Sequence, residues 1–312
     1  QRFKSQPDWL QIWPGHGAGS ACGKGLSAIP HSTVGYERRF NWAFAAEDED
    51  QFVRLVLAGQ PEPPAYFGLM KRVNKAGPAA LGGLPRPEEL PPERLAALVE
   101  AGGIVIDLRP AAEFAAAHIP GTLNFPHNRA FTSWVGSLLP YERDIHLLTG
   151  AGGGRSALHA ARDLALIGMD TVRGWFPAEA LDRWREAGRP LGRTRNVTAR
   201  EAARLARDGA AVVDVRSRAE WDAGHVPGAT HLPLGSLPRR LDELPPGQPL
   251  VLLCQGGGRS AIAASLLTAR GAREVVNLPG GFTEWSAEGL PVERGDTSPI
   301  ADLVVGPDVR RG

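Results

Sequence analysis

An internal repeat restricts the fold of this 312-residue chain more than any other feature of its sequence. The segment 107–114, which begins Asp-Leu-Arg, recurs 107 positions later at 214–221, which begins Asp-Val-Arg. A His-Ile-Pro-Gly turn at 118–121 recurs at the same spacing as His-Val-Pro-Gly. Gly-Gly-Gly-Arg-Ser at 152–156 recurs at 256–260, now 104 positions later. We therefore expect two copies of one module, with small loop insertions in the first copy.

Short apolar segments alternate with helical ones in each copy. In the second copy, residues 198–201 form a capping-box sequence that starts a helix reaching about Arg207. The remaining pattern predicts strands at 211–215, 250–253 and 274–278, and helices at 218–223, 259–270 and 282–287. Such alternation is typical of an α/β fold in which helices cover both faces of a parallel sheet. The reactive loops of such sheets lie at the carboxyl ends of the strands.

Composition and charge exclude several classes of function. The formal net charge of +1 gives no strong attraction to nucleic acid or to a membrane surface. The longest apolar runs are too short to cross a bilayer, and no basic-then-apolar leader precedes the first domain. Cys22 and Cys254 are the only cysteines, which is too few for a disulfide framework. The simplest location is therefore the reducing cytoplasm.

Cys254 occupies the most informative position in the chain. It follows the apolar run 250–253 and precedes three glycines and the start of a helix. The glycines allow backbone N–H groups to turn toward one point, and the helix adds the positive end of its dipole. Both effects favour a thiolate, which is a nucleophile and can hold a second sulfur as a persulfide. The plainer interpretation is a buried cysteine beside a glycine turn.

The spacing of Cys254 and Arg259, with four residues between them, resembles the active loop of the rhodanese (sulfurtransferase) family. Related phosphatases use a loop that is one residue longer, so the resemblance favours sulfur over phosphorus. It implies that Cys254 is the catalytic nucleophile and that no metal or organic cofactor is needed. It also implies small-molecule sulfur donors and acceptors, such as thiosulfate, persulfides and thiols. The expected substrate-binding residues are Gln255, Gly256, Gly257, Gly258, Arg259 and Ser260.

Three side chains of this loop have open roles. Arg259 either caps the loop or attracts a sulfonate or thiosulfate dianion. Ser260 either donates a hydrogen bond to the persulfide or caps the helix. Gln255 directly follows the thiol and is expected to shape the mouth of the pocket.

The first copy differs from the second at the position of the nucleophile. Aligning the glycine triplets places Gly150 opposite Cys254 and Arg155 opposite Arg259. A glycine cannot carry sulfur, so we expect a catalytically silent copy that serves packing, domain spacing or substrate channelling. Residues shared by both copies are interpreted as scaffold, including Arg216 and Glu220, which lie four residues apart and can form an ion pair. The same interpretation applies to Asp214, His225 and their first-copy counterparts Asp107 and His118.

Residues 1–84 do not belong to the repeat. Four of their motifs are Trp-Pro-Gly-His-Gly at 13–17, Ser-Ala-Cys-Gly-Lys at 20–24, Ser-Thr-Val-Gly-Tyr-Glu-Arg at 32–38 and Asn-Lys-Ala-Gly-Pro at 74–78. These motifs resemble the C-terminal end of a metallo-β-lactamase-fold domain of the persulfide dioxygenase type. Intact domains of this type bind iron or zinc through a His-x-His-x-Asp-His motif, which this sequence lacks. We therefore expect no metal here and interpret His16 as a loop histidine. Cys22 is either a second thiol that handles sulfur or a packed cysteine.

These observations lead to one organisation and a ranked set of functions. We expect an incomplete metallo-β-lactamase-like segment over 1–84, rhodanese-like domains over 85–192 and 193–296, and a tail over 297–312. The leading function is sulfur transfer through a Cys254 persulfide, within a protein that metabolises sulfide or persulfide. The alternatives are a non-catalytic binding module with a sensor thiol, and arsenate reduction or phosphatase chemistry, which the short loop disfavours. Nucleic acid and membrane are not expected as partners, and the sequence leaves a homo-oligomer open.

Overall fold

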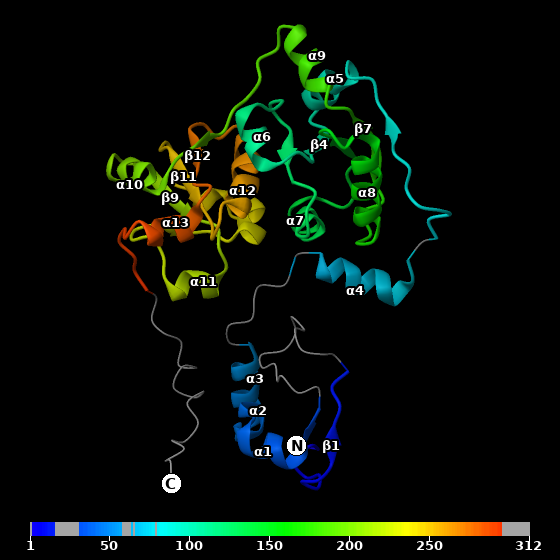
Figure 1. Cartoon of the computed structure of the whole chain (residues 1–312). Helices are drawn as coiled ribbons and strands as arrows, with labels where there is room; N and C mark the ends of the chain where they lie inside the picture. The colour runs from blue at the N-terminus through cyan, green and yellow to red at the C-terminus, as the bar shows by residue number, and fades with distance from the viewer. Residues whose placement is uncertain (1, 16–30, 58–63, 65, 79, 295–312) are drawn as a thin grey trace. The chain divides into compact units, whose positions relative to one another are not determined.

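The structure is a computed structural model, shown in Figure 1, and it describes residues 2–15, 31–57, 64, 66–78 and 80–294. Two compact units divide the chain, one formed by residues 1–61 and 296–312 and the other by residues 62–295. His16, interpreted as a loop histidine, and Cys22, whose role was left open, lie outside the described residues, as does the expected tail over 297–312.

The first unit contains one short antiparallel strand pair and three helices in its described part. These elements are β1 (Gln11–Ile12), β2 (Ser32–Thr33), α1 (Val34–Phe40), α2 (Trp42–Ala45) and α3 (Glu49–Leu57). The chain leaves helical geometry at Asn41, whose side-chain oxygen accepts a hydrogen bond from the backbone N–H of Ala43 and so starts α2. Trp9, Trp13 and Phe40 are exposed in this unit.

The second unit contains α4 (Phe67–Ala76) and both copies of the repeat. The first copy is a five-stranded parallel sheet in the order β3-β7-β6-β4-β5. Its strands are β3 (Glu88–Glu89), β4 (Ile104–Asp107), β5 (Leu123–Asn124), β6 (Ile145–Leu148) and β7 (Val172–Phe176). Its helices are α5 (Arg94–Glu100), α6 (Ala111–Ala116), α7 (Phe131–Leu138), α8 (Gly153–Ala165) and α9 (Ala180–Glu186).

The second copy repeats this architecture in the same strand order, β10-β9-β11-β12-β8, and all of its strand pairs are parallel. Its strands are β8 (Arg195–Asn196), β9 (Ala211–Asp214), β10 (Thr230–His231), β11 (Leu250–Leu253) and β12 (Val275–Asn277). Its helices are α10 (Ala199–Arg207), α11 (Arg218–Ala223), α12 (Gly258–Ala269) and α13 (Gly281–Ala287), with short 3₁₀ helices η1 (Leu234–Arg239) and η2 (Leu241–Glu243). The predicted α/β fold with two parallel sheets is confirmed.

Successive residues of each strand pack on opposite faces of the sheet, as a parallel sheet covered on both sides requires. In β9, Val212 packs in a cluster with residues of α10 and α13, whereas Val213 packs in the cluster that contains α12. The first copy is built the same way. Val105 of β4 packs with residues of α5 and α9, and its neighbours Ile104 and Ile106 pack with residues of α7 and α8.

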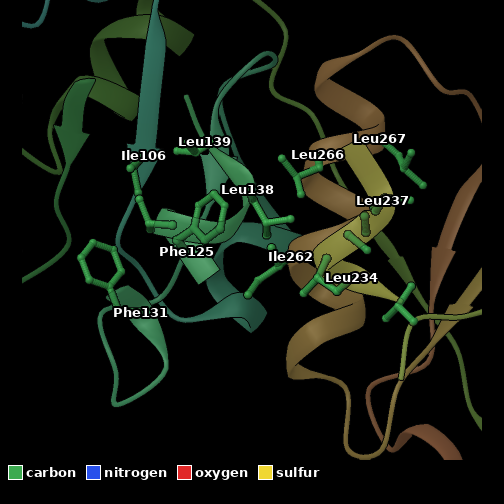
Figure 2. Close-up of a cluster of buried hydrophobic side chains, with 14 of the residues drawn as sticks. Ile106, Phe125, Phe131, Leu138, Leu139, Leu234, Leu237, Ile262, Leu266 and Leu267 are labelled. Atoms are coloured by element: carbon green, nitrogen blue, oxygen red, sulfur yellow. The ribbon is translucent and has the colours of Figure 1, made fainter. Parts of the chain in front are cut away.

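One continuous apolar core joins the two copies. It combines the α7 and α8 side of the first sheet with the α12 and η1 side of the second. In Figure 2, Ile262 and Leu266 of α12 lie on the side of that helix that is turned toward Phe125 and Leu138 of the first copy. A buried hydrogen bond crosses the same contact, because the backbone N–H of Asn124 donates to Ser265 Oγ at 3.0 Å. The first copy therefore packs directly on the helix that follows Cys254.

The register of the sheets corrects the alignment of the reactive loops. Asp107 pairs with Leu148 in the first copy, and the equivalent Asp214 pairs with Leu253 in the second. The residue after the strand is therefore Thr149 in one copy and Cys254 in the other, so the prediction that Gly150 replaces Cys254 is wrong by one residue. Five residues separate Thr149 from Arg155, whereas four separate Cys254 from Arg259. Matching glycines missed this shift because the first loop holds one more residue than the second.

In the part of the chain that the structure describes, every helix is too short or too polar to cross a membrane.

Candidate functional site

Cys254 lies between the end of β11 and the start of α12, as the sequence predicted. Its side chain is 2% exposed, yet it lines a cavity of about 480 Å³. The second copy contributes Gly256, Gly258, Arg259 and Ile262 to this cavity. The other wall comes from the first copy, chiefly from Pro110, Phe125, Pro126, Phe131 and Trp134. The thiol is thus buried against water but opens into a cavity between the two copies.

The loop after Cys254 leaves a run of backbone N–H groups without acceptors. Among the hydrogen bonds of the described residues, none has the amide of residues 255–260 as its donor, and the first backbone bond after the loop runs from Ala261 to the Gly257 carbonyl. Such amides are available to an anion, and those at the start of the 12-residue helix α12 add its dipole. The loop therefore meets the electrostatic requirement for a thiolate or a persulfide at Cys254.

The first two carbonyls of this loop are turned toward the N-terminal turn of α13. The Cys254 carbonyl accepts a hydrogen bond from the Phe282 N–H at 2.7 Å. The Gln255 carbonyl accepts hydrogen bonds from the Thr283 N–H at 3.1 Å and from Thr283 Oγ1 at 2.8 Å. These three bonds fix the loop from the side of α13.

Two glycines make this close approach possible. Gly257 has φ +83°, and a Cβ there would collide with the Pro279 carbonyl oxygen. Gly281 has φ +58°, and a Cβ there would collide with the Cys254 carbonyl oxygen. Only glycine combines a left-handed backbone with such a short distance to another backbone segment.

Arg259 forms a two-pronged ion pair with Glu220 at the N-terminal turn of α11. Its Nη1 and Nη2 donate to Glu220 Oε2 and Oε1 at 2.7 Å and 2.5 Å. Burial alone would raise the pKa of Glu220, but hydrogen bonds from Arg259 and Ser217 outweigh it and lower the pKa to about 2. Hydrogen bonds to Glu220 likewise raise the pKa of Arg259. The ion pair supports the structural role of Arg259, and the interaction with Cys254 that also raises its pKa leaves the anion-attracting role open.

Arg216 pairs with Asp214 and not with Glu220, which corrects the pairing inferred from their spacing. It donates to both Asp214 carboxylate oxygens and to the Gly224 carbonyl, and its Nη1 reaches Gln255 Oε1 at 3.2 Å. Its guanidinium also lies 3.9 Å from the ring centre of Phe282. The strand-end arginine thereby holds the residue that follows the thiol.

Ser260 lies beside the thiol, whereas Gln255, which was expected to shape the mouth of the pocket, is not among the residues that line the cavity. Ser260 Oγ is buried at 3.6 Å from Cys254 Sγ and at 3.1 Å from the Gly257 carbonyl, so its one proton has two possible acceptors. Gln255 is exposed and its Nε2 donates to Thr283 Oγ1 at 3.0 Å. Both proposed roles of Ser260 are therefore compatible with its geometry.

The histidines of the second copy support the scaffold and lie outside the cavity lining. His225 stacks on Trp221 at 3.7 Å between ring centres, as His118 stacks on Phe114 at 4.0 Å in the first copy. His231 packs near Trp221 and its Nε2 donates to the Arg216 carbonyl at 3.0 Å. Burial lowers the pKa of His231, which favours its neutral form. The matching contacts agree with the interpretation of His225 and His118 as packing residues.

The first-copy loop has a different local structure. The Gly153 N–H donates to the Gly150 carbonyl at 3.0 Å, so the loop closes on itself as a turn. Thr149 is fully buried and its Oγ1 donates to the Phe176 carbonyl at 3.2 Å. Glu113 and Arg155 are both exposed, and no ion pair of the described residues joins them. The first copy therefore lacks both the thiol and the contacts that shape the loop around it.

Sequence reasoning missed the residues that form the far wall of the cavity. Phe131 and Trp134 lie on α7 of the first copy, and Phe125 lies just after β5. Their apolar character indicated core positions but carried no signal that they face Cys254 from another copy. In the part of the chain that the structure describes, no three His, Cys, Asp or Glu side chains gather as metal ligands.

Comparison with known proteins identifies the repeat. The family model for rhodanese-like domains matches residues 91–174 and 198–288. A sulfurtransferase of Allochromatium vinosum is 38% identical over 81 residues, which are 26% of this chain and 76% of the relative. The thiosulfate sulfurtransferase GlpE of Ectopseudomonas mendocina is 34% identical over 93 residues, which are 30% of this chain and 85% of the relative.

Solved structures show further similarities. A metallo-beta-lactamase from Staphylococcus aureus is 36% identical with a TM-score of 0.43, over 56% of this chain and 47% of that chain. This chain thus spans less than half of that structure. A rhodanese-related protein from Thermoplasma volcanium is 27% identical with a TM-score of 0.30, over 32% of this chain and 97% of that chain. Since the two segments matched by the family model together make up more than half of the sequence, one in each copy of the repeat, the chain belongs to the family of rhodanese-like domains.

Proposed function

We propose that this protein is a sulfurtransferase in which Cys254 accepts and passes on a sulfane sulfur atom. The observation that carries the proposal is the thiol at the base of a cavity, followed by backbone amides of residues 255–260 that have no acceptor among the described residues. The names of the similar proteins, a sulfurtransferase and a thiosulfate sulfurtransferase, support the same reaction class. Thiosulfate and low-molecular-weight persulfides are the donors that we propose.

The reaction runs in two displacement steps. The Cys254 thiolate attacks the outer sulfur of thiosulfate, a bond forms between the two sulfur atoms, and sulfite leaves with the electron pair of the broken sulfur–sulfur bond. A thiophile such as cyanide or a thiol then attacks the outer sulfur of the Cys254 persulfide and regenerates the thiolate. Neither step needs a metal or an organic cofactor, and a covalent intermediate of this kind gives ping-pong kinetics.

Each loop residue has a defined part in this scheme. The amides of Gln255 to Ser260 stabilise the negative charge that stays at the Cys254 sulfur in both steps. Ser260 Oγ, at 3.6 Å from Sγ, adds a hydrogen bond to the thiolate or the persulfide. Arg259 acts through its ion pair with Glu220, which fixes the start of α12. Small-molecule donors and acceptors are thus the expected partners, and the scarcity of cysteine supports a reducing cytoplasmic location.

The matched cysteine variants Cys254→Ser and Cys22→Ser test this proposal. Thiosulfate:cyanide sulfur transfer should fall to background in Cys254→Ser, because serine cannot hold sulfane sulfur. It should persist in Cys22→Ser, which controls for the loss of a thiol elsewhere. Activity that survives in Cys254→Ser would remove the mechanism.

A further inference from the structure

The wall that the first copy supplies to the Cys254 cavity is mostly apolar, with Asn128 as its one polar side chain among the lining residues. Phe131 and Trp134 of α7 line the cavity together with Phe125 and Pro126. Phe125 and Phe131 are almost fully buried, whereas Trp134 is half-buried and presents part of its surface to the cavity. A substrate that reaches Cys254 therefore leaves water for a surface of aromatic rings.

This wall is held in place by contacts within the first copy. The ring of Phe131 meets His127 edge-on at 5.0 Å between ring centres, and His127 Nε2 lies 2.8 Å from the Asp163 carboxylate of α8. The backbone N–H of Trp134 donates to the Ala130 carbonyl at 3.1 Å. The aromatic wall is thus preorganised for a ligand.

The charges around the cavity argue against a strongly charged donor. Arg259 is the only charged residue among those described as lining it, and its guanidinium is engaged on two sides by Glu220. Arg216, whose Nη1 reaches Gln255 Oε1, is engaged by Asp214 in the same way. Among the residues that line the cavity, a thiosulfate dianion therefore has loop amides for one of its charges but no cation without an ion-pair partner for the other.

We propose that the first copy is the specificity element of the catalytic site, and that Phe131 and Trp134 bind the organic group of a monoanionic sulfur donor. The preferred donors are then organic thiosulfonates, R–SO₂–S⁻, and organic persulfides, R–S–S⁻, over thiosulfate. This inference rests on the proposed function, because it requires Cys254 to accept sulfur.

The chemistry balances for both donor classes. The Cys254 thiolate attacks the terminal sulfur, forms the new sulfur–sulfur bond, and expels a sulfinate or a thiolate that keeps the electron pair of the broken bond. Two negative charges stand on each side, no proton is transferred, and no external oxidant or reductant takes part. The organic group R stays outside the reacting atoms, where the aromatic wall can bind it.

The experiment compares benzenethiosulfonate with thiosulfate on the same enzyme preparation, with cyanide as the acceptor. The readout is the ratio of the two kcat/KM values, which does not depend on the fraction of protein that is folded. We expect the unchanged enzyme to favour benzenethiosulfonate by at least about tenfold, and Trp134→Ala to lower that ratio about tenfold. Trp134→Phe should retain most of the preference because it keeps an aromatic ring on α7.

The control is Trp175→Ala, which removes a tryptophan of the same copy that packs against Gly154 and does not line the cavity. This variant should leave the donor ratio within about twofold of the unchanged enzyme. A preference for thiosulfate in the unchanged enzyme, or an unaltered ratio in Trp134→Ala, overturns this inference alone. If neither donor leaves sulfur on Cys254, the proposed function fails as well.

Discussion

The two copies of the repeat share a scaffold but differ in the loop that follows the central strand. Both copies have the same strand order. In each copy an arginine forms a buried ion pair with the aspartate two residues earlier, at the end of the strand: Arg109 with Asp107, and Arg216 with Asp214. Both stack a histidine on an aromatic ring one turn earlier. Among the described residues, only the second copy places a thiol after the strand and ties the loop carbonyls to α13. The two copies therefore differ in a few loop contacts and not in the sheet.

The first copy contributes to packing and to the cavity around Cys254. It packs on α12 through a shared apolar core and a buried hydrogen bond to Ser265, and it supplies the aromatic wall of the cavity. Packing, one of the roles expected for the first copy from the sequence, is confirmed. In place of substrate channelling, we propose that the first copy selects the sulfur donor. The following predictions test whether the two copies differ in the way that these contacts suggest.

The largest effect concerns the position of the nucleophile. In a Cys254→Ser background, adding Thr149→Cys should leave sulfur transfer at background, although it restores a cysteine at the matching strand end. Thr149 is fully buried, and its loop is one residue longer and closes through the Gly153 to Gly150 hydrogen bond. The measurement is thiosulfate:cyanide transfer by the double variant. Recovered activity would show that the sheet scaffold alone suffices and that the loop contacts do not matter.

The second effect compares equivalent left-handed glycines in the two loops. Gly257→Ala places a methyl group against the Pro279 carbonyl at φ +83°, so we expect unfolding free energy to fall by about 2–5 kcal/mol and activity to fall with it. Gly153→Ala places its methyl group in open space at φ +50°, so it should cost only about 1–2 kcal/mol. Denaturant unfolding of both variants measures the difference. Equal losses would contradict the close packing of the second loop.

The third effect concerns the ion pair that only the second copy forms. Glu220→Gln should lower stability by about 1–3 kcal/mol because it weakens the hydrogen bonds to partly buried Arg259. Glu113→Gln in the first copy should change stability by less than about 0.5 kcal/mol, since Glu113 is exposed.

This ion pair also predicts a pH dependence. The folded pKa of Glu220, lowered to about 2, lies below its ordinary value of 4.5, so the contribution to stability is complete above pH 4.5 and is lost as the pH falls toward 2. The stability difference between the unchanged protein and Glu220→Gln should therefore shrink over this range. A difference that stays constant down to pH 2 would show that the carboxylate charge is not what Arg259 requires.

The smallest effect tests the contact between the copies. Ser265→Ala leaves the buried backbone N–H of Asn124 without its acceptor and should cost about 1–2 kcal/mol. Ser137→Ala, at an exposed serine on α7, is the matched control and should cost less than about 0.5 kcal/mol. The thermal unfolding midpoints of the two variants measure this difference. Equal midpoints would show that the contact between the copies is dispensable.

The sequence was sufficient for the sheet and for the place of the thiol, because both follow from local patterns. The run Leu250–Leu253 consists of leucine and β-branched valine, and the glycines after Cys254 end the strand. The helix predicted over 259–270 therefore lies within one residue of the observed α12. The ion-pair partner of Glu220 was not predictable from spacing. Arg216 lies four residues away on the chain, but its side chain turns back to the buried carboxylate of Asp214, which frees Glu220 for Arg259.

Two further features required the three-dimensional structure. Glycine matching could not distinguish Thr149 from Gly150, because only the pairing of β4 with β6 fixes which residue ends the strand. The aromatic wall arises from the contact between α7 and the second copy, and no periodicity within one copy encodes a contact with another. The position of the thiol loop was thus readable from sequence, whereas the residues that surround it were not.

The most direct test of this account is mass spectrometry of the protein after exposure to thiosulfate and removal of excess donor. The account predicts a gain of one sulfur atom per chain, located on the peptide that contains Cys254 and removed by cyanide. No added sulfur on that peptide, or sulfur found only on the peptide that contains Cys22, would contradict the claim that the second copy alone carries the reacting thiol.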